Sequence, residues 1–330
     1  MQHVRFGRTG LQVSRLCLGT MTFGLQCDEK TSFAILDAAE QAGITFIDTA
    51  DVYPMGATLA EVGRTEEIVG RWLRGKREKF VLATKCSGRM GPAPWQQGTS
   101  RKHVLASIDA SLKRLGTDYV DLYQVHHFDV HTLVDETVDA FNAVVRSGKA
   151  RYVGVTNYHA YRVARALGRS EALGFAKFVS VQPRYNLLFR QLERELLPLC
   201  AEESLAVIPY NPLAAGLLTG KHERGRPPSE GSRFTIGSAG KMYTERYWKE
   251  REFGAVEAFV GIARDAGIEP ATLAIAWVLA NPVVTAPILG ASKPEQLSAG
   301  IAAVEIKLDA TLKAKLDELT HEFRMGDAPR

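Results

Sequence analysis

The sequence predicts an α/β fold, namely a (β/α)8 or TIM barrel with an N-terminal β-hairpin and an extra C-terminal helix. Eight short runs rich in apolar and β-branched residues alternate with longer segments of helical periodicity. These runs lack polar alternation, which is typical of parallel strands covered on both faces. Barrels of this architecture reach the length of this chain, 330 residues, as one unit. Because no linker interrupts the pattern, we expect residues 1–330 to form a single domain.

The predicted strands follow one another through the whole chain. They are expected at residues 16–20, 44–48, 79–85, 119–126, 150–157, 178–182, 205–210 and 283–290. Capping residues mark the helices between them. Thr31 and Ser100 are expected to open helices, and glycines are expected to close them at Gly43, Gly116 and Gly148.

An open, doubly wound sheet is the rival architecture. It would place a GxGxxG fingerprint after the first strand, and the sequence GTMTFG at residues 19–24 lacks it. Three segments lie outside the barrel repeat. Residues 2–14 are expected to form a hairpin across the bottom of the barrel, and residues 308–323 a final amphipathic helix. Residues 222–247, rich in Gly, Ser, Pro and Arg, are expected to form a long loop, and loops of this length are usually functional or disordered. Closure of this loop over a cofactor is a hypothesis that its length and glycines suggest.

Composition and charge argue against several classes of function. The net charge is only +4, and Lys and Arg are scattered along the chain, which gives no support to nucleic-acid binding. No apolar run is long enough to cross a bilayer, and the first residues lack a signal-peptide pattern. The four cysteines are far apart and form neither CxxC nor a zinc spacing. We therefore expect a cytoplasmic protein that binds no metal, no nucleic acid and no membrane.

Reactive side chains gather where the predicted strands end, which is where the active site of such a barrel lies. Asp48 ends the second strand and Tyr53 follows it, while Lys85 ends the third strand and His126 the fourth. An ammonium beside a phenol lowers the pKa of the phenol, and an aspartate beside the lysine keeps the amine charged. The set therefore predicts proton donation from Tyr53 to a carbonyl oxygen, with His126 as a second, orienting donor.

Taken alone, each of these residues has an ordinary structural interpretation. An acid at a strand end is often a helix cap, and a tyrosine is most often a packing residue. Their combination at neighbouring strand ends favours catalysis. A Schiff-base aldolase with Lys85 as nucleophile is an alternative on the same barrel, and it requires an uncharged lysine. Asp48 argues against it, because a carboxylate beside the amine favours the ammonium form.

Several motifs follow one another along essentially the whole chain. They are ITFIDTADVYPMG, VLATK, YVDLYQVHHFD, VGVTNY, VQPRYNLL, IPYNPLAAGLLTGK and ILGASKPEQL. In kind and order they resemble the aldo-keto reductase family of NADP-dependent oxidoreductases, and are closest in style to its bacterial reductases and potassium-channel β-subunits. The resemblance implies the reversible reduction of an aldehyde or ketone to an alcohol with NADPH (NADP+). A low-turnover redox sensor or regulatory subunit that binds the nicotinamide nucleotide is the alternative.

The resemblance implies roles for the four residues at the strand ends. Tyr53 would be the general acid, with Lys85 and Asp48 as its tuning pair. His126 would orient the substrate by a hydrogen bond. The substrate, a small carbonyl compound, is expected to contact loop residues after the first four strands: Met21, Phe23, Val52, Trp95, His127 and Phe128. No further polar anchor narrows the substrate class, and the sequence predicts no oligomeric state.

The resemblance also implies a cofactor site spread over most of the strand ends. Its residues would be Gly19, Thr20, Met21, Asp48, Thr156, Asn157, Gln182, Tyr210, Asn211, Pro212, Leu213, Gly216, Leu218, Lys221, Arg233, Gly290, Ser292, Lys293 and Gln296. Those after the fifth and sixth strands would hold the nicotinamide carboxamide, and Tyr210 would stack on the ring. Those at positions 211–233 would wrap the pyrophosphate, and those at positions 292–296 the adenosine ribose and its phosphate.

The segment GASKPEQ gives independent support for NADPH. It lies between the eighth strand and a helix start, where backbone N–H groups and the helix dipole attract phosphate. The hydroxyl of Ser292 and the ammonium of Lys293 suit a phosphate better than a ribose diol, which favours NADPH over NADH. The sequence departs from the family pattern just beyond, where Ala299 and Gly300 replace the acid and amide that usually bind adenine.

Overall fold

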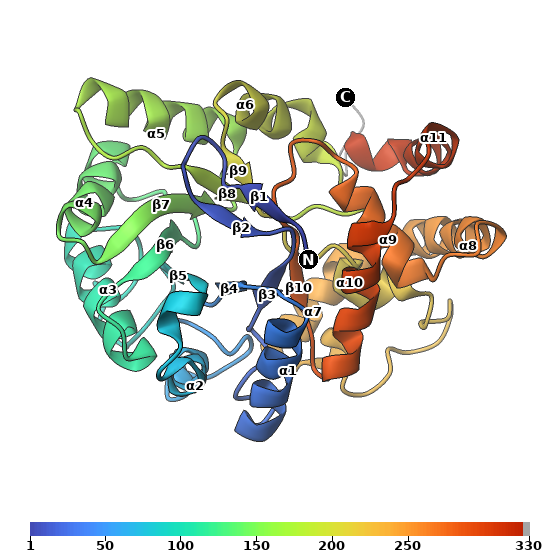
Figure 1. Cartoon of the computed structure of the whole chain (residues 1–330), viewed down its shortest axis with the longest axis horizontal. Helices are drawn as coiled ribbons and strands as arrows, with labels where there is room; N and C mark the ends of the chain where they lie inside the picture. The colour runs from blue at the N-terminus through green and yellow to red at the C-terminus, as the bar shows by residue number, and fades with distance from the viewer. Residues whose placement is uncertain (326–330) are drawn as a thin grey trace.

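The computed structural model describes residues 1–325, and eight parallel strands form its centre. They are β3 (Cys17–Gly19), β4 (Phe46–Asp48), β5 (Val81–Cys86), β6 (Val120–Val125), β7 (Ala150–Thr156), β8 (Ser180–Gln182), β9 (Ala206–Val207) and β10 (Ile288–Gly290). Their order in space is β10-β3-β4-β5-β6-β7-β8-β9. The ring closes where the N–H of Thr285, before β10, donates to the carbonyl of Val207 in β9 at 2.8 Å (Figure 1). The predicted barrel is confirmed, and each predicted strand overlaps an observed one.

Helices surround this ring of strands (Figure 1). They are α1 (Glu29–Gln41), α2 (Arg64–Leu73), α3 (Arg101–Leu115), α4 (Val134–Arg146), α5 (Ala160–Ala172), α6 (Leu196–Glu202), α8 (Glu250–Asp265), α9 (Pro270–Leu279) and α10 (Ser298–Glu305). The cap expected at Ser100 is confirmed, because its side chain accepts from the N–H of His103. The start expected at Thr31 is wrong: α1 begins earlier, and Asp28 accepts from the N–H of Thr31 at 2.7 Å. The charge of an aspartate also favours the positive end of the helix dipole.

The N-terminal hairpin closes the bottom of the barrel, as predicted. β1 (His3–Arg5) and β2 (Gln12–Ser14) pair antiparallel. Phe6, in the turn between them, is 1 % exposed and meets Phe46 of β4 with 5.8 Å between ring centroids. The turn requires Gly7, because its φ is 56° and a Cβ there would lie 2.6 Å from the backbone nitrogen of Ala206. The hairpin thus leaves the carboxyl ends of the strands as the open end of the barrel.

Residues 222–247 differ from the expected loop, because their second half is regular. A short turn, η4 (Arg233–Thr235), and a helix, α7 (Gly237–Tyr247), follow an irregular first half. Ala239, Tyr243 and Tyr247 are buried at a spacing of four residues, which gives this helix an apolar face in spite of its glycines. The expected final helix is observed as α11 (Ala310–Leu319), followed by η6 (His321–Arg324).

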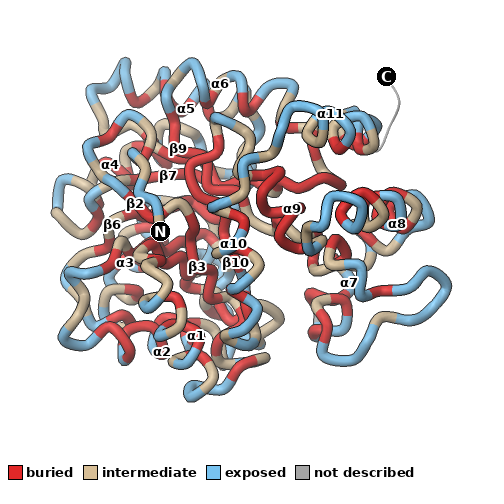
Figure 2. The backbone as a smooth tube through the Cα atoms, turned by 45° about the vertical axis from the view of Figure 1, so that its right-hand side comes forward, coloured by how far each residue is buried: buried red, intermediate tan, exposed pale blue. Residues whose placement is uncertain are grey.

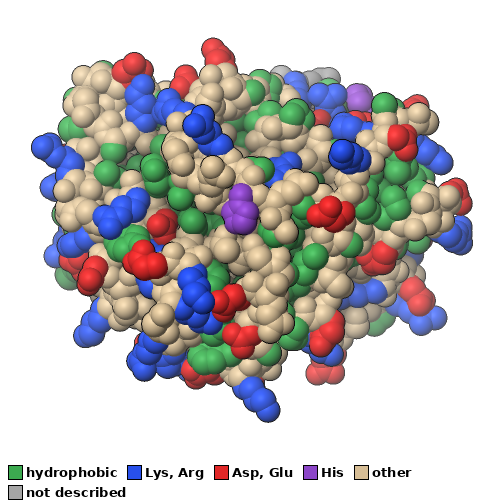
Figure 3. Space-filling view, viewed as in Figure 1, with side chains coloured by type: hydrophobic (Ala, Val, Ile, Leu, Met, Phe, Trp, Pro, Cys, Tyr) green, Lys and Arg blue, Asp and Glu red, His purple; other side chains and the backbone are tan. Residues whose placement is uncertain are grey.

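Burial is deepest in the strands and in α9, as Figure 2 shows. No helix within residues 1–325 is long and apolar enough to cross a membrane. On the face of the molecule seen in Figure 3, Lys and Arg alternate with Asp and Glu, and no extended patch carries one sign of charge. This face includes the hairpin that covers the bottom of the barrel.

The hairpin predicts a test of stability. Phe6→Ala should lower the free energy of unfolding by about 3–5 kcal/mol, because it leaves a cavity between the hairpin and the strands. Urea denaturation measures this loss. Arg5→Ala, on an exposed position of the same hairpin, is the matched control and should change stability little. An equally small effect of Phe6→Ala would show that the hairpin does not close the core.

Candidate active site

Four reactive side chains meet at the carboxyl ends of three neighbouring strands. Asp48 ends β4, Tyr53 follows it on the next loop, Lys85 lies near the end of β5, and His126 directly follows β6. Lys85 Nζ donates to Asp48 Oδ2 at 2.5 Å and to the Tyr53 hydroxyl at 3.3 Å. The rings of Tyr53 and His126 meet edge to face, with 5.6 Å between centroids. The structure therefore brings the predicted set together, and all four side chains are buried.

Two glutamines complete the hydrogen bonding of the Asp48 carboxylate. Its Oδ1 accepts from Gln182 Nε2 at 2.8 Å and from Gln124 Nε2 at 3.1 Å. The lysine is held in a similar way, since its ammonium also donates to the Thr49 carbonyl at 2.9 Å. The sequence prediction missed Gln124, whose only signal is an amide near the end of the strand YVDLYQVH. Gln182, expected at the nicotinamide carboxamide, contacts Asp48 here.

Burial sets the protonation of the phenol and the imidazole. It raises the pKa of Tyr53 to about 12, and the charge of Lys85 offsets this only in part. The lowering expected from Lys85 is present, but in the protein alone the effect of burial on the phenol pKa is larger, because burial disfavours the charged phenolate. Burial also holds the pKa of His126 well below its usual value, and the charge of Lys85 acts in the same direction. At neutral pH the site holds a neutral phenol and a neutral imidazole.

Lys85 remains charged although it is fully buried. Burial lowers its pKa, but attraction to Asp48 and Tyr53 outweighs this effect and the pKa lies above its ordinary value. A Schiff-base nucleophile needs an amine that has lost its proton. The electrostatics of the site therefore argue against the aldolase alternative.

The end of β7 adds an amide and a hydroxyl to the site. Asn157 has a φ of 60°, donates from Nδ2 to the His126 carbonyl at 3.0 Å, and accepts from the Tyr210 hydroxyl at 2.8 Å. Thr156 Oγ1 is buried and has no hydrogen-bond partner among the described residues. Such an orphaned hydroxyl costs free energy unless a ligand or water satisfies it. It therefore suits a polar ligand group such as a carboxamide.

The loop after β9 has left-handed backbone beside an ammonium. Asn211, Ala214, Ala215 and Gly216 have φ values of 64°, 49°, 60° and 95°. Asn211 Oδ1 stabilises this turn by accepting from the N–H of Ala215 at 2.7 Å. A Cβ on Gly216 would lie 3.7 Å from Lys221 Nζ, so an ammonium lies beside the turn. The N–H groups of Ala214 and Gly216 also donate inside the loop, to the carbonyls of Asn211 and Leu213 at 3.0 Å and 2.8 Å. The other predicted residues of this loop are buried or half-buried: Pro212, Leu213 and Leu218.

The ends of β3 and β10 lie side by side and hold the next predicted cofactor residues. Gly19 pairs in register with Gly290, and Thr20 Oγ1 donates to the last carbonyl of β4 at 3.0 Å. The guanidinium of Arg233 lies over Gly290, where an added Cβ would collide with it, and it approaches the Met21 sulfur at 3.3 Å. A glycine at position 290 is what allows this close approach.

The segment after β10 places a hydroxyl and an ammonium at a helix start. Ser292 N–H and Oγ contact Gln296 Oε1 at 2.8 Å and 3.3 Å, and Lys293 is exposed. The short turn η5 (Pro294–Leu297) leads from there into α10. A Cβ on Gly300 would collide with the side chain of Leu289. Packing against β10 therefore explains why this chain has no larger adenine-binding side chain at that position.

The predicted substrate residues do not all reach the mouth of the barrel. The ring of His127 stacks on that of His126 with 4.6 Å between centroids, and Trp95 is 56 % exposed on the loop after β5. Phe128 lies edge-on against Tyr158. Phe23, in contrast, is 0 % exposed and packs in the hydrophobic core. Its expected contact with substrate is wrong, because the tight turn after β3 directs its ring inward.

The helix α7 reaches the same end of the barrel, which the sequence prediction missed. The hydroxyl of Tyr247 accepts from Asn186 Nδ2 at 3.0 Å and from Asn211 Nδ2 at 3.1 Å. Those asparagines lie on the loops after β8 and β9. The segment before α7 reaches across to the loop after β3, where Gln26 Nε2 donates to the carbonyl of Gly231 at 3.4 Å.

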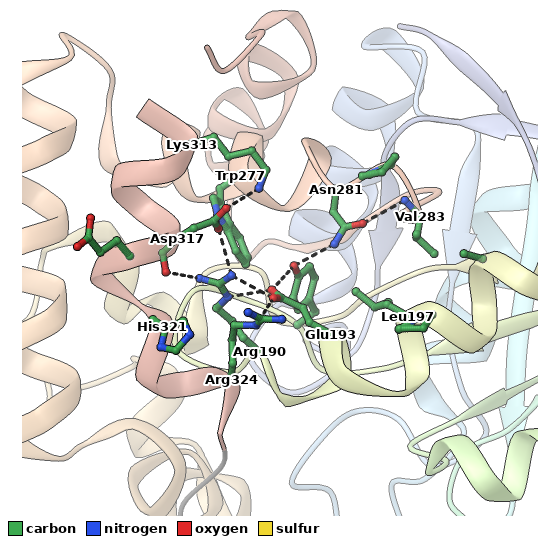
Figure 4. Close-up of a pocket in the computed structure, with 15 residues that line it drawn as sticks. Arg190, Glu193, Leu197, Trp277, Asn281, Val283, Lys313, Asp317, His321 and Arg324 are labelled. Atoms are coloured by element: carbon green, nitrogen blue, oxygen red, sulfur yellow. Dashed lines mark hydrogen bonds and ion pairs between the residues drawn. The ribbon is translucent and has the colours of Figure 1, made fainter. Parts of the chain in front are cut away.

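The structure also contains a cavity of about 800 Å³ between η2 (Gln191–Arg194), α6, α9 and α11. Figure 4 shows Arg190 in its wall, between Glu193 and Asp317. Arg190 is 4 % exposed and binds Glu193 with two hydrogen bonds, of 2.8 Å and 3.0 Å. None of the four predicted catalytic residues lines this cavity. Its polar groups bind one another and tie the C-terminal helix to the barrel.

Similar proteins cover almost the whole chain. The model of the aldo/keto reductase family matches residues 15–321. The oxidoreductase YrpG of Bacillus subtilis (strain 168) is 41 % identical over 328 residues, which are 97 % of this chain and 96 % of YrpG. Protein tas of Escherichia coli (strain K12) is 37 % identical over 354 residues, with both chains fully covered. A probable voltage-gated potassium channel subunit beta of Arabidopsis thaliana is 37 % identical over 311 residues, 93 % of this chain and 92 % of its own.

The buried ion pair predicts a pH-dependent loss of stability. Asp48→Asn leaves the Lys85 ammonium buried without its counterion and should lower the free energy of unfolding by about 3–5 kcal/mol at neutral pH. In the variant, Lys85 keeps its contacts with the Tyr53 hydroxyl and the Thr49 carbonyl but loses its counterion, so burial should bring its pKa in the folded state below the unfolded value. The penalty is therefore largest at low pH and shrinks as the pH rises towards the unfolded pKa of lysine.

Urea denaturation of both proteins between neutral and alkaline pH measures this difference. Asp135→Asn, which removes an exposed partner of Arg169, is the control and should change stability little at any pH. A constant difference between wild type and Asp48→Asn across this range would contradict the assigned charge of Lys85.

Proposed function

Because the chain belongs to the aldo/keto reductase family, we propose that this oxidoreductase reduces an aldehyde or a ketone to an alcohol, reversibly, with NADPH as cofactor. The observation that carries this proposal is the contact of Lys85 with both Asp48 and the Tyr53 hydroxyl inside the barrel mouth. A buried phenol next to a permanent ammonium is a proton donor whose conjugate base is stabilised at the moment it forms.

Each of the four clustered side chains has its own role in the proposed reaction. A bound nicotinamide would supply the hydride for the carbonyl carbon. Tyr53 gives its phenolic proton to the carbonyl oxygen, and solvent later returns a proton to the phenolate. Lys85 stabilises the phenolate, and Asp48 holds the ammonium in place. His126 is neutral, so it donates one N–H to the same oxygen without competing as an acid.

The chain has groups that fit each part of a nicotinamide dinucleotide. The orphaned Thr156 hydroxyl suits the carboxamide. The ammonium of Lys221, beside the turn that contains Gly216, suits the pyrophosphate. Ser292 and Lys293 suit the additional phosphate of NADPH at the start of a helix. The segment 222–247 lies across the same end of the barrel, in position to cover the dinucleotide, with Arg233 over Gly290.

A redox sensor or regulatory subunit with little turnover is the second candidate. It is favoured by the likeness to a relative named as a probable potassium channel subunit beta. Both candidates bind the same nucleotide, and they differ in whether the chain turns over repeatedly. The complete and buried set of Asp48, Tyr53, Lys85 and His126 supports catalysis.

Tyr53→Phe tests the role of the phenol. It should lower kcat for reduction of an aromatic aldehyde by roughly 100- to 10,000-fold, because the proton donor is lost. The dissociation constant for NADPH, measured by fluorescence titration, should change little, since the ring remains. Tyr243→Phe, which removes a hydroxyl from α7 in the same region, is the control. Activity of Tyr53→Phe equal to wild type would remove Tyr53 from the mechanism.

Lys293→Ala tests the preference for NADPH. Loss of a charged contact to a phosphate should weaken NADPH binding roughly tenfold. NADH lacks that phosphate, so its affinity should stay the same. Lys307→Ala, an exposed lysine after α10, controls for general charge. If both nucleotides weaken equally, Lys293 does not recognise the phosphate of NADPH.

A further inference from the structure

His127 presents a second imidazole at the open end of the barrel. Its ring lies nearly parallel to that of His126, with an interplanar angle of 8° and 4.6 Å between centroids. The ring of His126 in turn meets that of Tyr53 at 5.6 Å between centroids. His126 is only 5 % exposed, whereas His127 is exposed. An accessible imidazole therefore lies one ring away from the proposed carbonyl site.

The backbone of His127 is held by the loop after β5. Its N–H donates to the Ser87 hydroxyl at 2.9 Å. Ser87 is 8 % exposed and has a φ of 106°, a backbone conformation that residues with a side chain rarely adopt. Its carbonyl accepts from the N–H of Gly98 at 2.9 Å, on the loop that also carries Trp95. Unfavourable backbone of this kind persists only where the surroundings enforce it, and it is frequent at functional sites.

A contact with Asn157 determines which nitrogen of the His127 ring carries the proton. Asn157 Oδ1 accepts from the Tyr210 hydroxyl at 2.8 Å and Nδ2 donates to the His126 carbonyl at 3.0 Å, which fixes the orientation of this amide. The same Nδ2 lies 3.4 Å from His127 Nδ1. Because an amide nitrogen can only donate, Nδ1 accepts and the proton lies on Nε2. Within residues 1–325 this Nε2 has no hydrogen-bond partner.

The free N–H of His127 suits a neutral oxygen. Desolvation at the barrel mouth lowers the pKa of His127, and the charge of Lys85 acts in the same direction, so the ring is neutral at neutral pH. A neutral donor forms an ordinary hydrogen bond with an ether, hydroxyl or carbonyl oxygen and offers no charge to a carboxylate. Because His126 lies in the next parallel ring, the two imidazoles can bind two oxygens that are carried by adjacent carbon atoms.

We propose that His127 determines substrate specificity by donating from Nε2 to a second oxygen of the substrate, attached to the carbon next to the reacting carbonyl. The preferred substrates are then aldehydes or ketones with an ether, hydroxyl or carbonyl oxygen at that carbon. This inference rests on the proposed carbonyl reduction and narrows its substrate class. The reacting oxygen lies at Tyr53 and His126, and the second oxygen lies at His127.

Two ketones of nearly the same shape test the inference by turnover. In α-methoxyacetophenone an ether oxygen takes the place of one methylene of butyrophenone. The ratio of kcat/KM for the methoxyketone to that for butyrophenone should fall roughly tenfold in His127→Phe, which keeps a flat ring and loses the donor. The intrinsic reactivity of the two ketones cancels when this ratio is compared between proteins.

Two further variants control for the shape of the site. His127→Gln keeps an N–H donor and should retain part of the wild-type ratio. His131→Phe changes an exposed histidine of the same loop and should retain all of it. A ratio that stays the same in His127→Phe overturns the inference. This holds even if both ketones are reduced more slowly, because His127 then only packs against His126.

Equilibrium binding separates this inference from the proposed reaction. Calorimetry uses the protein saturated with NADP+, which cannot reduce a ketone. In His127→Phe the affinity for α-methoxyacetophenone relative to butyrophenone should fall roughly tenfold, while the affinity for NADP+ is kept. That result supports the second donor even if no ketone is turned over, in which case only the proposed reaction fails. If His127→Phe weakens NADP+ as much as the methoxyketone, the imidazole serves the cofactor and the inference is wrong.

Discussion

The buried contact between Lys85 and Asp48 determines the arrangement of the whole site. Two charges inside a barrel cost several kcal/mol each in lost hydration, and only good geometry and further hydrogen bonds offset that cost. Here Gln124, Gln182 and the Thr49 carbonyl supply those bonds. The ammonium is thereby fixed 3.3 Å from the Tyr53 hydroxyl. Because neither partner can move without exposing an unpaired charge, the phenol has a permanent cation beside it.

The two ends of the barrel follow different requirements. At the bottom, Phe6 and its hairpin close the core with apolar contacts and a glycine turn that admits no side chain. At the open end, several local features are energetically unfavourable, and packing alone does not explain them. These include an orphaned hydroxyl at Thr156 and left-handed backbone at position 211 and at positions 214–216. Such features concentrate where a ligand offsets their cost.

The fold was predictable from sequence because parallel strands covered on both faces leave continuous apolar runs. The clustering of Asp48, Tyr53, Lys85 and His126 was predictable because the same runs fix where the strands end. The remainder depends on tertiary contacts that no local pattern encodes. Burial reverses the expected pKa shift of Tyr53. Glycines at positions 237 and 240 weaken the helical pattern of α7 in the sequence. The apolar face of this helix is evident only from its packing in the structure. The ring of Phe23 points into the core. The side chain of Leu289 occupies the space that a Cβ at position 300 would need, which explains the glycine there.

Repeated turnover is the most direct test of carbonyl reduction as the function of this chain. The protein is mixed with a large excess of NADPH and an aromatic aldehyde, and nicotinamide absorbance and alcohol are followed together. Catalysis by the Tyr53 site predicts steady loss of NADPH over many equivalents of protein, with one alcohol formed for each nicotinamide oxidised. Oxidation that stops after a single equivalent, with the oxidised nucleotide still bound, would contradict catalytic reduction and identify a sensor.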